Sequence, residues 1–259
     1  MVNDSHTENI TPFNTKRDVP VIEIQNLKKS FGSQEVLTDV SLKLFNSENL
    51  AVLGKSGTGK SVLIKCIVGL LKSDGGTINV FGKNVNSLNR IELGELRTKI
   101  GFLFQSGALY DSMTVKQNLE FPLRRIKKNL TEKEISEKVN EVLENVGLAD
   151  ALNKMPSQLS GGMRKRISLA RTIAVDPLIM LYDEPTTGLD PVTSDEISSL
   201  INDVQKKYKT SSIIITHDIK CALATAERII MLEGGGVYKE GKVEDFKNSA
   251  DPLIKSFFN

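Results

Sequence analysis

The chain contains no tryptophan, few aromatic residues and little excess of charge of either sign. Aromatic residues make up 5% of its 259 residues, so a surface for stacking nucleobases is not expected. The formal net charge of +2 is too small to indicate the basic surface that binds nucleic acid, and we expect no nucleic-acid partner. No run of about 18 apolar residues is present, so the sequence predicts no membrane-spanning helix.

Cysteine is also scarce, with two residues, Cys66 and Cys221. Both lie in apolar segments with a helical pattern, and their spacing matches no metal or redox motif. We therefore expect buried, reduced thiols, which fit a reducing compartment. Residues 1–20 are polar, carry both charge signs and lack the apolar core of a signal peptide. They predict a flexible tail ahead of one domain at 21–259, and a cytosolic location.

Short apolar runs alternate with helical patterns along most of the chain, which is typical of the α/β class. The runs at 49–54, 178–183 and 211–217 predict buried parallel strands. The first helix is predicted from Lys60 to Leu71. Ahead of it, two segments of alternating polarity, "VIEIQNL" and "SLKLF", indicate an N-terminal antiparallel β subdomain.

One stretch breaks this alternation, because the pattern from Thr114 to Val146 is helical, with no strand-like run. Thr131 and Glu134 have the spacing of a capping box, and the apolar residues after them recur on one helix face. We therefore predict a helical subdomain, at approximately 106–162, inserted into the core.

The segment "GKSGTGKS" lies between a predicted buried strand and a helix, and it matches the phosphate-loop pattern G-x-x-x-x-G-K-[ST]. Glycines let the backbone wrap closely around phosphates at a helix N-terminus. Lys60 would place a charge on the outer phosphates, and Ser61 Oγ would ligate Mg²⁺. The candidate ATP-binding residues here are Gly54, Lys55, Ser56, Gly57, Thr58, Gly59, Lys60, Ser61 and Val62.

A second motif, "LIMLYDEP", is an apolar strand that ends in adjacent carboxylates, Asp183 and Glu184. An aspartate at this position can hold Mg²⁺, and the following glutamate can orient and deprotonate an attacking water. Considered alone, the pair could also begin a turn at Pro185. Together with the phosphate loop, it predicts a P-loop NTPase core of the RecA-like type. That class includes GTPases, kinases, helicases and transport ATPases.

The segment "LSGGMRKR" (159–166) predicts a helix from Met163 to Val175 with Ser160 as its N-cap. The free N–H groups at such a helix start suit a phosphate. The predicted helical insert would carry them away from the chain's own phosphate loop.

From Val21 onward, the chain resembles the nucleotide-binding subunits of ABC transporters. Its motifs occur in the order of that family. They are Phe31 in "KKSFG", the loop "GKSGTGKS", Gln105 in "FLFQS", "LSGGM", "LIMLYDE", "GLD" at 188–190, and His217. The resemblance implies that Phe31 stacks on adenine, that Gln105 senses Mg²⁺ and water, and that His217 acts as the switch histidine. The expected catalytic residues are Glu184, His217, Gln105 and Lys60, and the expected Mg²⁺ ligands are Ser61, Gln105 and Asp183.

The resemblance also implies partners. Two copies of the chain would pair head-to-tail, so that Ser160, Gly161 and Gly162 of one copy reach the ATP held by the other. A membrane permease would dock beside Gln105 and the helical insert. The protein would then lie peripherally on the cytoplasmic side of the inner membrane.

Met163 departs from the common family signature, which has glutamine at this position. Together with "FQSGALYDSMTVKQNLEFPLR" and "SADPLIKSFF", it is similar to ATPases of the Mla/Mce lipid-transport systems, which imply phospholipid cargo and an MCE-domain partner. Alternatively, Met163 is an ordinary helix-start residue. Other ABC transporters, a non-transport ABC ATPase and a binding-only module are the remaining interpretations, although intact Glu184 and His217 argue against the last.

Overall fold

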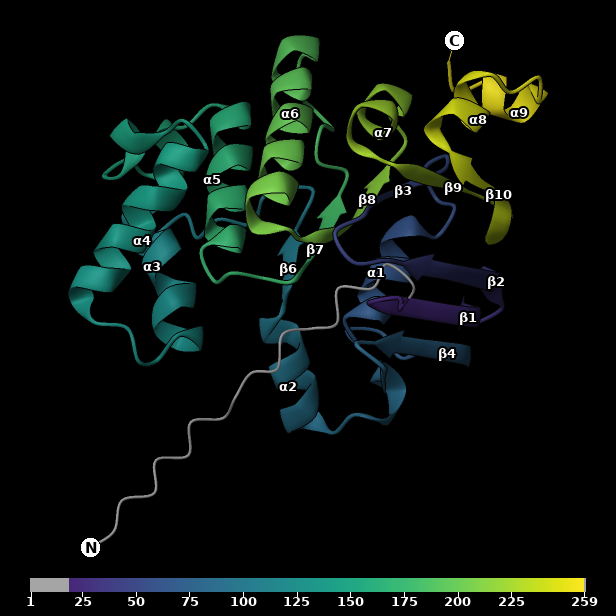
Figure 1. Cartoon of the computed structure of the whole chain (residues 1–259), viewed down its shortest axis with the longest axis horizontal. Helices are drawn as coiled ribbons and strands as arrows, with labels where there is room; N and C mark the ends of the chain where they lie inside the picture. The colour runs from purple at the N-terminus through teal and green to yellow at the C-terminus, as the bar shows by residue number, and fades with distance from the viewer. Residues whose placement is uncertain (1–18, 259) are drawn as a thin grey trace, which may run out of the picture.

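A computed structural model describes residues 19–258, so residues 1–18 of the predicted tail lie outside the described part. Within that part, ten strands form one sheet in the order β5-β4-β1-β2-β10-β9-β3-β8-β7-β6 (Figure 1). The strands are β1 (Ile22–Phe31), β2 (Gln34–Leu44), β3 (Asn49–Leu53), β4 (Gly75–Val80), β5 (Lys83–Asn84), β6 (Ile100–Leu103), β7 (Ile179–Asp183), β8 (Ser211–Thr216), β9 (Arg228–Glu233) and β10 (Gly236–Lys242).

Helices α5, α6 and α7 lie over the strands of the sheet's parallel part (Figure 1). The α-helices are α1 (Lys60–Ile67), α2 (Arg90–Thr98), α3 (Val115–Ile126), α4 (Glu132–Asn145), α5 (Gly161–Ile173), α6 (Pro191–Tyr208), α7 (Ile219–Thr225), α8 (Val243–Lys247) and α9 (Pro252–Lys255). Short 3₁₀ turns occur at Val85–Ser87, Ala149–Ala151 and Pro156–Gln158. The predicted α/β class is confirmed.

The parallel part of the sheet contains β3, β6, β7, β8 and β9. Every residue of β3, β7 and β8 is buried, because helices cover both faces of these strands, and this explains their unbroken apolar sequences. Leu53 pairs with Thr216, and Leu103 pairs with Tyr182. The strands therefore end at one edge, and the loops that follow them lie together.

The antiparallel part contains β1, β2, β4 and β5, as the alternating polarity of "VIEIQNL" and "SLKLF" predicts. It joins the parallel part through β10, where Gly236 pairs with Asp39 of β2. Helix α1 packs between the two parts, since Leu63 and Ile64 belong to the same apolar cluster as residues of β1 and β3. This packing connects the phosphate loop directly to both halves of the molecule.

Between β6 and β7 the described chain contains helices and no strand. Helices α3 and α4 each begin with a capping box, including the predicted one at Thr131 and Glu134. Their apolar faces share one cluster with Met180 of β7 and Ile214 of β8. The cluster contains residues from both sides of position 162, so it does not separate an insert from the core. The helical subdomain predicted at approximately 106–162 therefore stays a prediction.

Three predicted helix limits were wrong by a few residues, among them the end of α5, which is Ile173 and not Val175. Helix α5 begins at Gly161 and not at Met163, although Ser160 is its N-cap as predicted and its Oγ accepts a hydrogen bond from Met163 N. Helix α1 ends at Ile67 and not at Leu71. Gly69 adopts a φ of 65°, and a left-handed residue of this kind ends a helix.

Both cysteines are buried and free, as predicted. Burial raises the pKa of the Cys66 thiol, and that of the Cys221 thiol, to about 11. At pH 8 both side chains are therefore protonated thiols, which are weak nucleophiles.

We predict that iodoacetamide at pH 8 leaves both thiols of the folded protein unmodified, whereas both react after unfolding in urea. Mass spectrometry of the intact and digested protein measures this. Modification of Cys66 or Cys221 in the folded protein at the rate seen in urea would contradict the burial described here.

Candidate functional site

A cavity of about 290 Å³ lies at the edge where β3, β6, β7 and β8 end. It contains most of the sequence-predicted catalytic and phosphate-loop residues. Its lining consists of Val36, Ser56, Gly57, Gly59, Lys60, Ser61, Val62, Gln105, Glu184 and His217. Of these, Val36 was not predicted from the sequence, because nothing in "GSQEVL" distinguishes it from any half-buried strand residue.

The phosphate loop presses closely against β2. A Cβ atom on Gly59 would lie 2.6 Å from Leu37 Cδ2 and 2.9 Å from Val36 O, and Gly59 has a φ of 92°. Only glycine is compatible with both constraints. Thr58 Oγ1 donates a hydrogen bond of 2.9 Å to Lys55 O, which closes the loop on itself.

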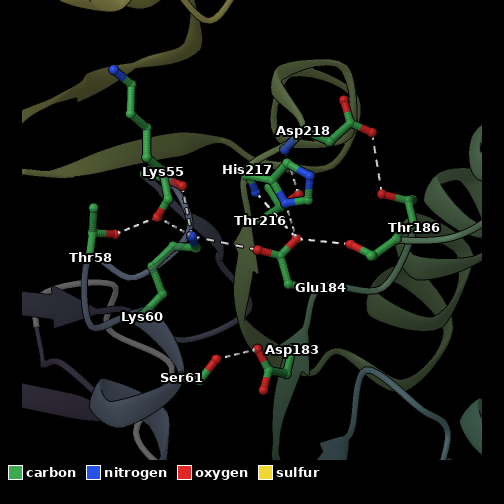
Figure 2. A network of polar contacts seen from close by, with 12 residues as sticks. Lys55, Thr58, Lys60, Ser61, Asp183, Glu184, Thr186, Thr216, His217 and Asp218 are labelled. Atoms are coloured by element: carbon green, nitrogen blue, oxygen red, sulfur yellow. Dashed lines mark hydrogen bonds and ion pairs between the residues drawn. The ribbon is translucent and has the colours of Figure 1, made fainter.

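Lys60 points into the cavity from the first residue of α1 and is only 5% exposed. Its Nζ donates hydrogen bonds of 2.7 Å to Gly54 O and 2.9 Å to Lys55 O, and it lies 3.5 Å from Glu184 Oε1 (Figure 2). Burial lowers the pKa of Lys60, and the carboxylates of Glu184 and Asp183 oppose that effect. The ammonium group is thus held at the centre of the cavity, among backbone oxygens.

Ser61 lines the cavity and meets Asp183 beside it, where Ser61 Oγ donates a 3.0 Å hydrogen bond to Asp183 Oδ1 (Figure 2). Burial raises the pKa of Asp183, and the Ser61 hydrogen bond partly offsets this. A hydroxyl and a carboxylate are the oxygen ligands that Mg²⁺ accepts in proteins. Residues 19–258 contain no group of three acidic, histidine or cysteine side chains that could hold a metal ion by themselves. A Mg²⁺ ion here would therefore take further ligands from phosphate and water.

Glu184 adopts a left-handed backbone conformation, with a φ of 51°, directly after β7. Such a conformation is costly for a residue with a side chain and is frequently found at functional sites. The Glu184 N–H donates to Ile215 O at 2.9 Å, which ties this turn to β8. The conformation directs the carboxylate toward Lys60 and away from the strand.

The Glu184 carboxylate and His217 form a close pair, with 2.8 Å between Glu184 Oε2 and His217 Nδ1 (Figure 2). The same oxygen accepts hydrogen bonds from His217 N at 3.3 Å and from Thr187 Oγ1 at 3.1 Å. The His217 side chain is 54% exposed, so its other ring nitrogen can reach a bound molecule.

Sequence reasoning missed two further residues beside Glu184. One is Thr187, described above. The other is Lys165 of α5, which stands between Arg164 and Arg166 in the sequence but is buried. Ser168, Leu169 and Thr172 follow Lys165 on the same buried helix face, and this spacing was the available signal.

The remaining predicted site residues do not line the cavity, and among them Gly54, Lys55, Thr58 and Asp183 belong to the segments that do. Phe31 is 47% exposed at the end of β1, with Lys29 Nζ 5.4 Å from its ring centroid. Ser160, Gly161 and Gly162 lie at the start of α5 and do not line the cavity. Within one chain, therefore, the structure brings the phosphate loop together with Gln105, Glu184 and His217, but not with the "LSGGM" segment.

The sequence profile described as "ABC transporter" matches residues 37–187, which is more than half of the chain. The chain belongs to the ABC transporter family. It is an ATP-binding, ATP-hydrolysing subunit of that family, and its fold is the P-loop NTPase fold of these cassettes.

Curated relatives support the same assignment. The chain is 41% identical to the "Probable ribonucleotide transport ATP-binding protein mkl" of Mycobacterium leprae, an alignment that covers 92% of this chain and 68% of that protein. It is 36% identical to the "Methionine import ATP-binding protein MetN" of Brucella abortus, over 92% of this chain and 64% of that protein. The chain thus spans about two thirds of the length of these relatives.

Solved structures agree with the fold. The ATP-binding cassette MJ0796, determined as a dimer in a post-hydrolysis state bound to ADP and Pi, is similar with a TM-score of 0.78 and 32% identity, over 86% of this chain and 98% of that one. CbiO1 from Clostridium perfringens, part of the ABC transporter complex cbiONQ, is similar with a TM-score of 0.82 and 27% identity, over 93% of this chain and 95% of that one. In the described part of this chain, no helix has both the length and the apolar character needed to cross a membrane.

We predict that Lys60→Ala abolishes ATP binding, because it removes the ammonium group that the loop backbone holds at the cavity. Equilibrium binding of a fluorescent ATP analogue measures this. Lys72→Ala, which removes an exposed lysine beyond α1, is the control and should bind normally. ATP binding by the Lys60 variant at the wild-type affinity would refute the placement of the phosphates.

Proposed function

We propose that this chain hydrolyses Mg²⁺-ATP at the cavity beside β3 and β7, with Glu184 as the general base. The observation that carries the proposal is the environment of the Glu184 carboxylate. That group is directed by a left-handed backbone, held by His217 and Thr187, and placed 3.5 Å from Lys60 Nζ. A carboxylate held in this way can accept a proton from a water that attacks the γ-phosphate.

Each neighbouring residue has a separate role in this proposal. Lys60 and the loop N–H groups bind the β- and γ-phosphates, and His217 orients Glu184 and contacts the γ-phosphate. Ser61 and Asp183 would hold Mg²⁺, with Gln105 beside it, and the ion would neutralise charge on the phosphates. Phe31 would supply a flat face for adenine.

We further propose that two copies of the chain form the complete site. Ser160, Gly161 and Gly162 begin a helix of 13 residues, whose N-terminus favours anionic groups, yet they do not line their own chain's cavity. A head-to-tail pair would bring them to the phosphates of the other copy. The dimeric state of the similar MJ0796 cassette supports this arrangement.

The transport partner and cargo are also proposals. A permease would hold the dimer at the cytoplasmic face of the inner membrane, and we propose a phospholipid as cargo, with an MCE-domain protein as a third component. The support is the similarity of the segments around Gln105 and Met163 to lipid-transport ATPases. Met163 itself packs partly buried against the helical cluster, so ordinary packing accounts for its apolar side chain. The names of the relatives favour a second candidate, the transport of a ribonucleotide or the import of methionine.

We predict that Glu184→Gln lowers the rate of ATP hydrolysis by about 10²–10⁴-fold, the usual contribution of a general base, while ATP binding is retained. The variant should accumulate as an ATP-bound dimer, measurable by light scattering after size exclusion. Glu137→Gln, on the exposed surface of α4, is the matched control and should behave as wild type. Rapid hydrolysis by a monomeric Glu184→Gln protein would rule out both the base and the paired site.

A second experiment addresses the cargo. The chain is purified from detergent-solubilised membranes with its bound partners, and mass spectrometry identifies the proteins and any lipid. We expect a permease, an MCE-domain protein and phospholipid. A permease accompanied by a binding protein for methionine or a nucleotide would refute the lipid proposal and leave the ATPase proposal standing.

A further inference from the structure

Lys165 is a buried lysine that joins two loops of the catalytic edge. It lies in α5, little more than one turn after the N-cap Ser160, and is 7% exposed. Its Nζ donates hydrogen bonds to Gln105 O and, at 3.3 Å, to Glu184 O. One ammonium group therefore holds the backbone of Gln105, two residues beyond β6, and of Glu184, the residue after β7.

The position of these two oxygens explains why a hydrogen-bond donor is needed there. Strands β6 and β7 pair side by side up to Leu103 and Tyr182, and beyond that point their backbones separate. Carbonyl groups just past a strand pair lose their partners in the sheet and take other donors, and Glu184 O accepts from Thr187 N at 3.3 Å as well as from Lys165 Nζ. Lys165 supplies a donor to both loops at once.

Burying a charged group in order to satisfy two carbonyl groups has a large desolvation cost. Burial lowers the pKa of Lys165, while the nearby Asp183 and Glu184 carboxylates oppose that effect. Within residues 19–258, Lys165 makes no ion pair, so its charge is balanced at longer range by the same two carboxylates that the site uses. Neutral side chains would satisfy the carbonyls with a smaller desolvation cost.

The same helix holds the loop after Gln105 at a second place. Arg171 donates hydrogen bonds of 2.7 Å to Ala108 O and 3.1 Å to Gly107 O. Arg171 therefore fixes the loop alone, whereas Lys165 fixes the loop relative to Glu184. Arg171 thus supports only the loop, whereas Lys165 also holds the backbone of Glu184.

We infer that Lys165 is a positioning residue for ATP hydrolysis, which sets the separation between Gln105 and Glu184 by holding both backbones. The inference rests on the proposed role of Glu184 as the base. Without Lys165, the strained left-handed turn at Glu184 loses one of its restraints, and the carboxylate moves relative to the phosphates. Displacements of about 1 Å at a reacting centre can cost on the order of 10² in rate.

The test uses steady-state ATP hydrolysis by the full chain and three variants. Lys165→Met keeps the length and apolar stem but removes the donor and the charge, and we expect kcat to fall by about 10²-fold with KM for ATP unchanged. Lys165→Arg keeps the hydrogen-bond donor and the charge, and should restore most of kcat. Lys138→Met, which removes another largely buried lysine at a distance from the site, is the matched control and should hydrolyse ATP normally.

The outcomes distinguish the inference from its alternatives. A fall in kcat that is rescued by arginine, at an unchanged KM, supports positioning. Normal kcat in a folded Lys165→Met protein overturns the inference, and so does equal loss of activity in the methionine and arginine variants. If Lys165→Met does not fold, Lys165→Gln replaces it, with the same expected fall in kcat and the same overturning result. Failure of the proposed function is seen separately, as unimpaired hydrolysis by Glu184→Gln.

Discussion

The parallel pairing of β3, β6, β7 and β8 is the constraint on which the rest of this structure depends. Since the strands run in one direction, each delivers its following residue to the same edge of the sheet. The edge thus collects a phosphate loop, Gln105, Glu184 and His217 from segments far apart in the chain. Burial of every residue in β3, β7 and β8 makes this edge rigid, and rigid support is what a phosphate-transfer site needs.

Helix α5 links this edge to the rest of the molecule. Its first residues carry the "SGG" segment, its buried face carries Lys165, and its last turn carries Arg171. Side chains of this helix donate hydrogen bonds to backbone oxygens of the loop after β6 and of the turn after β7. Its N-terminus, by contrast, does not line the cavity of the same chain. A single rigid element thus connects the chain's own carboxylate with the segment that we propose to serve the other copy.

Much of the site could be predicted from the sequence, because its residues lie in local patterns with a mechanical reason. A glycine-rich turn between a strand and a helix, and an apolar strand ending in Asp183 and Glu184, are both readable without coordinates. Val36 and Thr187 could not be found this way, and for Lys165 the helical spacing indicated a buried face but not its two partners. Each of them joins the site through a contact with a distant or irregular segment, and Lys165 in particular stands in a run of basic residues.

The sequence by itself determined the fold class, the phosphate loop, the N-cap at Ser160 and the capping box at Thr131, since these depend on residues within one or two turns of each other. The tertiary structure alone decided which distant groups meet. Ser61 and Asp183 are 122 positions apart, yet they share a hydrogen bond. The left-handed turn at Glu184 likewise exists because β8 and α5 hold its backbone from two sides, and such restraint arises only when the strands and helices have packed.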